Sequence, residues 1–147
     1  MTSISRTRIA GKSWMRSSAT RTKSVRRAAP AVAFVGLSEG QSVARRATFR
    51  VRLANFTISP TIAPPKLVPG QGFLHFSMDG GALDLPGYSA NAAWAVRAGT
   101  QGRYSPAMAP SLTYSNLPRG VHSLRVTLSD NFHAETGVTV AVSFVVR

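Results

Sequence analysis

The stretch that decides the fold is VHSLRVTLSDNFHAETGVTVAVSFVVR, residues 121–147. Its first part places Leu124, Val126 and Leu128 on one face of an extended chain. Its last part has a valine or a phenylalanine at every second position from Val138 to Val146. Such alternation has the two-residue period of a half-buried β-strand and not the 3.6-residue period of a helix. We therefore predict two β-strands at this end of the chain.

Other stretches show the same alternation. Residues 47–58 (ATFRVRLANFTI) set Phe49, Val51 and Leu53 against two arginines, which separates a buried face from a solvent face. Further strands are predicted at 31–37 (AVAFVGL), 72–79 (GFLHFSMD), 82–85 (ALDL) and 111–117 (SLTYSNL). The glycines of Asp79-Gly80-Gly81 supply the positive φ angles of a tight hairpin turn between residues 72–79 and 82–85.

Residues 86–110 break this period, and their alanine-rich part, 89–99, is compatible with a short helix. Seven or so short strands without a long helix predict an all-β fold, a single immunoglobulin- or fibronectin-like antiparallel β-sandwich. The longest apolar run has about ten residues and includes Pro30, well short of the ~20 that a membrane-spanning helix needs. The chain has no cysteine, so disulfides and thiolate metal sites are excluded.

Positive charge is concentrated at the N-terminus. The chain of 147 residues has a net charge of +13, and residues 1–29 contain eight lysines and arginines but no acidic residue. A segment of this composition cannot bury enough apolar surface to fold. We predict a basic disordered tail or targeting segment at 1–29 and the sandwich at 30–147. An over-extended reading frame stays open, whereas a secretory signal is less favoured because the apolar run at 28–37 fits a first strand better.

Four stretches together resemble a known group of domains: GFLHFSMDGG (72–81), GRYSP (102–106), LTYSNLPRGVHSLRVTLSDNFH (112–133) and VSFVVR (142–147). They are similar to small, largely uncharacterised bacterial immunoglobulin-like or fibronectin-like domains. These have a Gly-x-x-His-x-x-x-Asp-Gly-Gly hairpin and a Leu-Pro-x-Gly-x-His strand. The resemblance covers roughly residues 30–147 and implies a secreted or cell-surface location, although no convincing signal peptide precedes the domain. Phe73 stands where such domains often have a first histidine.

The three histidines carry the metal hypothesis. A copper or zinc site needs several ligands that converge on one point. If residues 72–79 and 121–130 run antiparallel, His75 approaches His133, and Asp130 or Glu135 completes a weak divalent site. His122 lies at the opposite end of its strand from His133, ~30 Å away at 3.3 Å per residue. We expect His122 to be structural and to bond back to the preceding corner, and His75 otherwise to form part of a wall.

No sequence motif indicates catalysis. Nucleophile and phosphate-binding motifs are absent, and Asp79, Gly80 and Gly81 are ordinary turn residues with a structural role. Tyr88, Trp94 and Tyr104 either contact a partner or pin their own loop. The sequence therefore favours a non-enzymatic binding module with an unidentified protein or glycan partner, and the alternative is the metal-binding domain. Nucleic-acid binding would rest on the tail alone and is not favoured.

Overall fold

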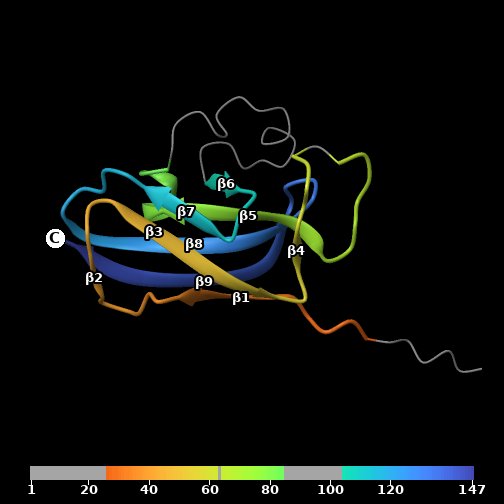
Figure 1. The fold of residues 1–147 in the computed structure, drawn as a ribbon, viewed down its shortest axis with the longest axis horizontal. Helices are drawn as coiled ribbons and strands as arrows, with labels where there is room; N and C mark the ends of the chain where they lie inside the picture. Colours follow the sequence, from red (N-terminus) through yellow and green to blue (C-terminus); the bar gives the residue numbers. More distant parts are fainter. Residues whose placement is uncertain (1–25, 63, 85–103) are drawn as a thin grey trace, which may run out of the picture.

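β-Strands build the framework of the computed structural model (Figure 1), which describes residues 26–62, 64–84 and 104–147. The strands are β1 (Ala31–Val35), β2 (Ser42–Val43), β3 (Ala47–Ala54), β4 (Thr57–Ile58), β5 (Gln71–Met78), β6 (Ser105–Ala107), β7 (Ser111–Tyr114), β8 (Gly120–Asp130) and β9 (Glu135–Val146). One 3-10 turn, η1, covers Asp79–Gly81. The prediction of an all-β fold is confirmed for these residues.

The strands form two sheets. A three-stranded sheet has the order β1-β3-β7, and a larger, curled sheet has the order β2-β9-β8-β5-β4, with β6 also paired to β5. Not every pair is antiparallel, because β2 pairs with β9 and β4 pairs with β5 in parallel over two residues each. The expectation of a purely antiparallel arrangement is therefore wrong at these two short edges. The long pairs β5–β8 and β8–β9 are antiparallel.

The main core lies between the two sheets. Phe49 and Val51 of β3 face residues of β5, β8 and β9, and the ring centroid of Phe49 lies 5.1 Å from that of Phe144. The alternating residues predicted from the sequence form this core: Leu74, Phe76, Met78, Leu124, Val126, Leu128, Val142 and Phe144 are all buried. Burial of such side chains is the main favourable contribution to folding.

β5 is buried on both faces. Leu74, Phe76 and Met78 enter the main core, while Phe73 and His75 on the other face are also almost completely buried. β6 pairs with the edge of β5, with Pro106 opposite His75, and the rings of Tyr104 and His133 cover the second face. The sequence predicted neither β6 nor this second layer of packing.

Three local predictions need correction. The strand predicted at 47–58 is interrupted after Ala54, because Asn55 adopts a φ of 54°. Asp79–Gly81 forms a 3-10 turn and not a two-residue hairpin, although Gly80 and Gly81 do have the predicted positive φ angles. Residues 82–84 then form a turn and not a strand. Positive φ angles alone are compatible with either kind of turn. In the 3-10 turn that forms, the carboxylate of Asp79 is hydrogen-bonded to β8.

The segments on either side of these elements are only partly described. Residues 1–25 and the predicted helix at 89–99 lie outside the described residues, so the boundary at Pro30 stays a prediction. Two hydrogen bonds tie the start of the described chain to the domain, from Arg27 to the carbonyl oxygen of Pro69 and from Asn55 to that of Ala29. Among the described residues no helix is long and apolar enough to span a membrane.

Gly72 sets the closest approach between β5 and β8. A Cβ atom on this residue would collide with the carbonyl oxygen of Ser129 and with the backbone of Asp130. We expect Gly72→Ala to lower the free energy of unfolding by about 3 kcal/mol, because the backbone must shift to admit the methyl group. Urea denaturation followed by circular dichroism measures this change.

Gly40→Ala is the matched control. Gly40 has a φ of +72°, and a methyl group added to it would point into open space without touching another residue. Its replacement should cost about 1 kcal/mol from backbone strain alone. Equal losses for the two variants would show that the β5–β8 contact at Gly72 is not tight.

Candidate functional site

Four rings with nearly parallel planes cover the outer face of β5, and we call Phe73, His75, Tyr104 and His133 the ring stack. Tyr104 lies on His75 with ring centroids 3.5 Å apart and an interplanar angle of 5°. Phe73 lies on His133 at 4.2 Å and 3°, and the two histidines are 5.8 Å apart at 7°. All four side chains are 2% exposed or less. The antiparallel β5–β8 arrangement thus brings His75 and His133 together as predicted.

Three different elements place these rings. Phe73 and His75 are two residues apart on β5, so they project from the same face of the strand. Tyr104 immediately precedes β6, which pairs with β5. His133 lies in the turn between β8 and β9, where its φ of +66° is unusual for a residue with a side chain. The stack therefore depends on the conformation of that turn.

Asp130 holds the turn in this conformation. Its Oδ1 accepts hydrogen bonds from the backbone N–H of Phe132 at 2.8 Å and from that of Ala134 at 3.0 Å. Asn131 ties the turn to the neighbouring loop, because its side-chain amide donates to the carbonyl oxygen of Lys66. The carboxylate of Asp130 thus has a structural role, whereas the sequence had indicated a metal ligand.

The geometry of the histidines does not favour the copper or zinc hypothesis. An imidazole nitrogen presents its lone pair in the plane of the ring, so two stacked rings do not direct lone pairs at a common ion between them. His133 is also hydrogen-bonded through Nε2 to the carbonyl oxygen of Ile62 at 3.3 Å. In the described part of the chain, no group of three or more histidine, aspartate or glutamate side chains is placed to hold a metal ion.

His75 is a neutral imidazole without hydrogen bonds to the described residues. Both of its ring nitrogens are buried, and the nearest carboxylate oxygen, Oε1 of Glu135, is 3.8 Å from Nδ1, too far for a hydrogen bond. Burial, followed by the positive charge that His133 can carry, lowers the pKa of His75 to about 3. Burial likewise lowers the pKa of His133. His75 thus lies in a wall of packed side chains, as expected from the sequence.

His122 has the opposite environment. Its Nδ1 lies 2.7 Å from Oδ2 of Asp79, and its Nε2 lies 2.7 Å from the carbonyl oxygen of Pro118. The second contact is the predicted bond back to the preceding corner. Both partners accept hydrogen bonds, and only the charged imidazolium can donate from both nitrogens. Burial alone would lower the pKa of His122, but the hydrogen bonds to Asp79 and Pro118 and the charge of Asp79 outweigh it and raise that pKa.

The carboxylate of Asp84, which follows the end of β5, is also hydrogen-bonded within the domain. Asp84 accepts hydrogen bonds through Oδ1 from the backbone N–H of Met78 and from the hydroxyl of Tyr114, each at 3.0 Å. Burial raises the pKa of Asp84 to about 6, although both hydrogen bonds oppose the rise. Burial and the neighbouring Asp84 raise the pKa of Tyr114. Asp79 and Asp84 thus fix the end of β5, which is a structural use of the pair.

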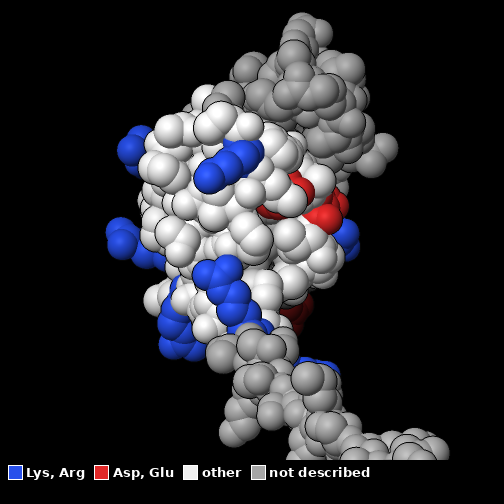
Figure 2. Space-filling model, turned by 90° about the vertical axis from the view of Figure 1, so that its right-hand side faces the viewer, with Lys and Arg blue, Asp and Glu red and all other residues white. Residues whose placement is uncertain are grey.

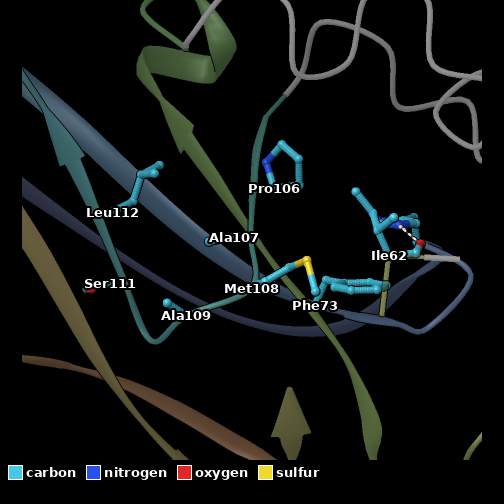
Figure 3. Close-up of a pocket in the computed structure, with 9 residues that line it drawn as sticks. Ile62, Phe73, Pro106, Ala107, Met108, Ala109, Ser111 and Leu112 are labelled. Atoms are coloured by element: carbon cyan, nitrogen blue, oxygen red, sulfur yellow. Dashed lines mark hydrogen bonds between the residues drawn. The ribbon is translucent and has the colours of Figure 1, made fainter. Parts of the chain in front are cut away.

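An apolar pocket opens beside the ring stack. It has a volume of about 380 Å³ and lies between the loop that contains Ile62, the β6–β7 connection and the ring stack. Figure 3 shows Met108 next to the ring of Phe73, with Leu112 and Ile62 on opposite sides. The lining residues are Ile62, Phe73, Pro106, Ala107, Met108, Ala109, Ser111, Leu112 and His133. None of them is charged at neutral pH, because burial keeps the pKa of His133 low.

Some exposed apolar side chains line this pocket, and others lie close in sequence to its lining residues. Met108 and Ile62 are 46% and 51% exposed, and Leu67 and Phe132, at 53% and 48%, flank the contact between Asn131 and the 66–68 backbone. Only two other large apolar side chains of the described residues are as exposed, Val35 and Val121. Figure 2 shows the corresponding end of the molecule, where uncharged residues make up most of the described surface. We call Ile62 and Met108, which are exposed and line the pocket, the apolar rim.

The rim and most of the pocket lining were missed in the sequence. Ile62 lies in a proline-rich loop, and Met108 lies in the irregular stretch between β6 and β7, so no periodic pattern marked them. The sequence had suggested three aromatic residues as possible contacts to a partner. Tyr104 is 2% exposed and pins its segment to His75, and Tyr88 and Trp94 lie outside the described residues.

Comparison with protein-family models, curated proteins and solved structures finds no match to this chain.

The buried neutral His75 makes a prediction about acid stability. Its folded pKa lies below the unfolded value of 6.5, so the unfolded chain binds the proton first and stability is lost as the pH falls below 6.5. Between pH 7 and pH 5, protonation of this residue in the unfolded chain should lower the free energy of unfolding by about 2 kcal/mol. His75→Phe keeps the stack on Tyr104 and cannot be protonated, so it should remove that part of the acid sensitivity. Urea denaturation at both pH values measures the difference.

His75→Leu is the control for size, because phenylalanine is larger than histidine. Both apolar variants should reduce the loss on acidification by the same amount, even if they differ in stability at pH 7. Asp84 and His133 titrate alike in all three proteins and cancel from the comparison. A parallel fall of wild type and variants would contradict a neutral, buried His75.

For the His122–Asp79 pair we predict the opposite dependence of stability on pH. Because the folded pKa of His122 is raised, its stabilisation is fully present below pH 6.5 and is lost as the pH rises through the folded pKa. A double-mutant cycle with Asp79→Asn and His122→Gln should give a coupling energy of about 2 kcal/mol at pH 5.5. At pH 9 the coupling should be much smaller. A coupling energy independent of pH would show that the imidazole is neutral in the folded state.

Proposed function

We propose that residues 30–147 form a non-enzymatic binding module with an immunoglobulin-like sandwich fold, whose apolar pocket receives an apolar side chain of a protein partner. The observation that carries this proposal is the apolar pocket of about 380 Å³ framed by the exposed apolar rim. Soluble proteins rarely expose such side chains together unless another molecule covers them. An apolar anchor that fills a pocket is also the usual centre of a protein interface.

The strand order supports the sandwich part of the proposal. One sheet has the order β1-β3-β7 and the other contains β9-β8-β5. In chain order this division corresponds to the A, B and E strands of an immunoglobulin-like domain facing its G, F and C strands. β1 and β2 lie close in sequence but belong to different sheets, so the first edge strand is divided between the two layers.

The lining of the pocket favours a protein over a glycan. Apart from its apolar residues the pocket offers only Ser111 and His133, and the Nε2 of His133 is already bonded to Ile62. A sugar has many hydroxyl groups, and each hydroxyl that loses its water without a new partner weakens binding. An aliphatic or aromatic side chain makes no such demand.

The roles of the acid–base residues support the non-enzymatic part. Asp79 and His122 bond to each other and to the backbone, Asp84 accepts hydrogen bonds from the N–H of Met78 and the hydroxyl of Tyr114, and His75 is buried. A catalytic acid or base has to reach a substrate. None of these four side chains lines the apolar pocket.

Amino-acid amides can test the pocket without a known partner. N-acetyl-tryptophanamide and N-acetyl-leucinamide should shift the methyl resonances of Ile62, Met108 and Leu112 of the ¹³C-methyl-labelled full chain. Burial of one such side chain is worth about 3 kcal/mol, which corresponds to a Kd of several millimolar. N-acetyl-glutaminamide should leave these resonances unchanged.

Met108→Asp and Val121→Asp form a matched pair of variants, because both side chains are exposed but only Met108 lines the pocket. The first should abolish the shifts and the second should retain them. Equal responses to the glutamine and leucine amides, or binding that survives Met108→Asp, would refute the pocket as the binding site.

A further inference from the structure

Two exposed arginines lie on the three-stranded sheet, close to the apolar pocket. Arg50 and Arg52 alternate along β3 with the buried Phe49 and Val51. Side chains of a strand point alternately to its two faces, so both arginines project from the solvent face of the β1-β3-β7 sheet. They are about 6.6 Å apart along the strand. This face therefore carries two neighbouring positive charges.

No described acidic residue neutralises these two charges. The strands β1, β3 and β7 contain neither aspartate nor glutamate. Among the described residues, aspartate and glutamate form ion pairs with histidines, Glu135 with His75 and Asp79 with His122. The guanidinium groups on β3 are therefore available to the carboxylates of another molecule.

Short side chains flank the arginines on this face. In the register of β1 and β3, Val35 lies opposite Arg50 and Ala33 lies opposite Arg52. On the other side of β3, Ser111 of β7 lies opposite Arg50. Directly opposite residues of an antiparallel pair are neighbours on the same face of the sheet. None of these neighbours extends as far from the sheet as an arginine, so a partner can approach both guanidinium groups.

β7 connects this face to the apolar pocket. Ser111 is the register partner of Arg50 and also lines the pocket, where Figure 3 shows it on β7. Ala109 lines the pocket as well, and the next carbonyl oxygen, that of Pro110, accepts a hydrogen bond from the N–H of Val51 at 2.9 Å. The pocket and the arginines thus lie on either side of β7, about 10 Å apart at 4.8 Å per strand spacing.

We propose that the partner segment that fills the apolar pocket is acidic, with carboxylates that cross β7 and pair with Arg50 and Arg52. This inference rests on the proposed function and names the chemistry of its partner. An extended chain advances about 3.3 Å per residue, so the carboxylates lie about three residues from the apolar anchor. Complementary charge beside an apolar anchor adds specificity and speeds association. A second copy of this chain, with its net charge of +13, is a poor occupant.

Short peptides with acetylated and amidated ends serve as probes. Each contains a leucine, two glycines and two glutamates, in this order or in the reverse order, and its matched control has glutamines in place of the glutamates. The methyl resonances of Ile62, Met108 and Leu112 of the ¹³C-methyl-labelled full chain report binding. In one of the two orders the glutamate peptide should bind about five-fold more tightly than its control, since exposed ion pairs contribute modestly. Salt at about 0.5 M should remove most of this gain.

Protein variants separate a local ion pair from the overall charge of the chain. Arg50→Gln combined with Arg52→Gln should abolish the preference for glutamate. Arg125→Gln combined with Arg147→Gln removes the same charge from exposed positions outside the three-stranded sheet and should retain the preference.

The outcomes distinguish this inference from the proposed function. Equal affinities for the glutamate and glutamine peptides in both orders would overturn the inference and leave the pocket as the binding site. A preference for glutamate that survives the replacement of Arg50 and Arg52 would overturn it as well. If no leucine peptide shifts the three methyl resonances, the pocket itself is refuted, and this inference falls with it.

Discussion

The antiparallel pairing of β5 with β8 is the constraint on which the other features depend. The register runs from Gly72 opposite Asp130 to Met78 opposite Leu124, and it permits a close approach at Gly72 that no larger residue allows. This register places alternate residues of β5 in the main core. It also brings the turn after β8 next to the other face of β5, where the ring stack forms. The apolar pocket lies against that stack.

The same strand pair holds two histidines in contrasting states. His75 faces aromatic rings and has no hydrogen-bonding partner among the described residues, so desolvation governs and the ring is neutral. His122, near the opposite end of the pair, lies between a carboxylate and a carbonyl oxygen, and two acceptors favour the imidazolium. Both side chains are buried, so the hydrogen-bonding partners decide the charge. The folded domain thus contains one acid-sensitive and one base-sensitive contact.

The apolar rim and pocket offer side-chain burial at the end of the domain that carries the 131–134 turn. Apolar burial gives affinity for many apolar groups.

The sequence by itself determined the longer strands and much of the core, because alternation records which face of a strand is buried. Leu124, Val126, Leu128 and Phe144 were assigned to buried faces in this way, and the approach of His75 to His133 followed from an antiparallel pairing. The corner bond of His122 followed from its position after Gly120. These features depend on short-range pattern and on one assumption about strand order.

Tertiary structure alone decided the rest. The ring orientation does not favour the metal hypothesis, and it depends on the positive φ of His133 and on the stacking of Tyr104 on His75. The apolar rim is formed by loop residues far apart in the chain, and a loop leaves no periodic signal. The partner of Asp79 on β8 was equally hidden, because Asp79 and Ser123, 44 positions apart in the chain, are brought together only by the sheet. A sequence pattern reports which side of an element is buried, but what meets that side depends on how the elements pack.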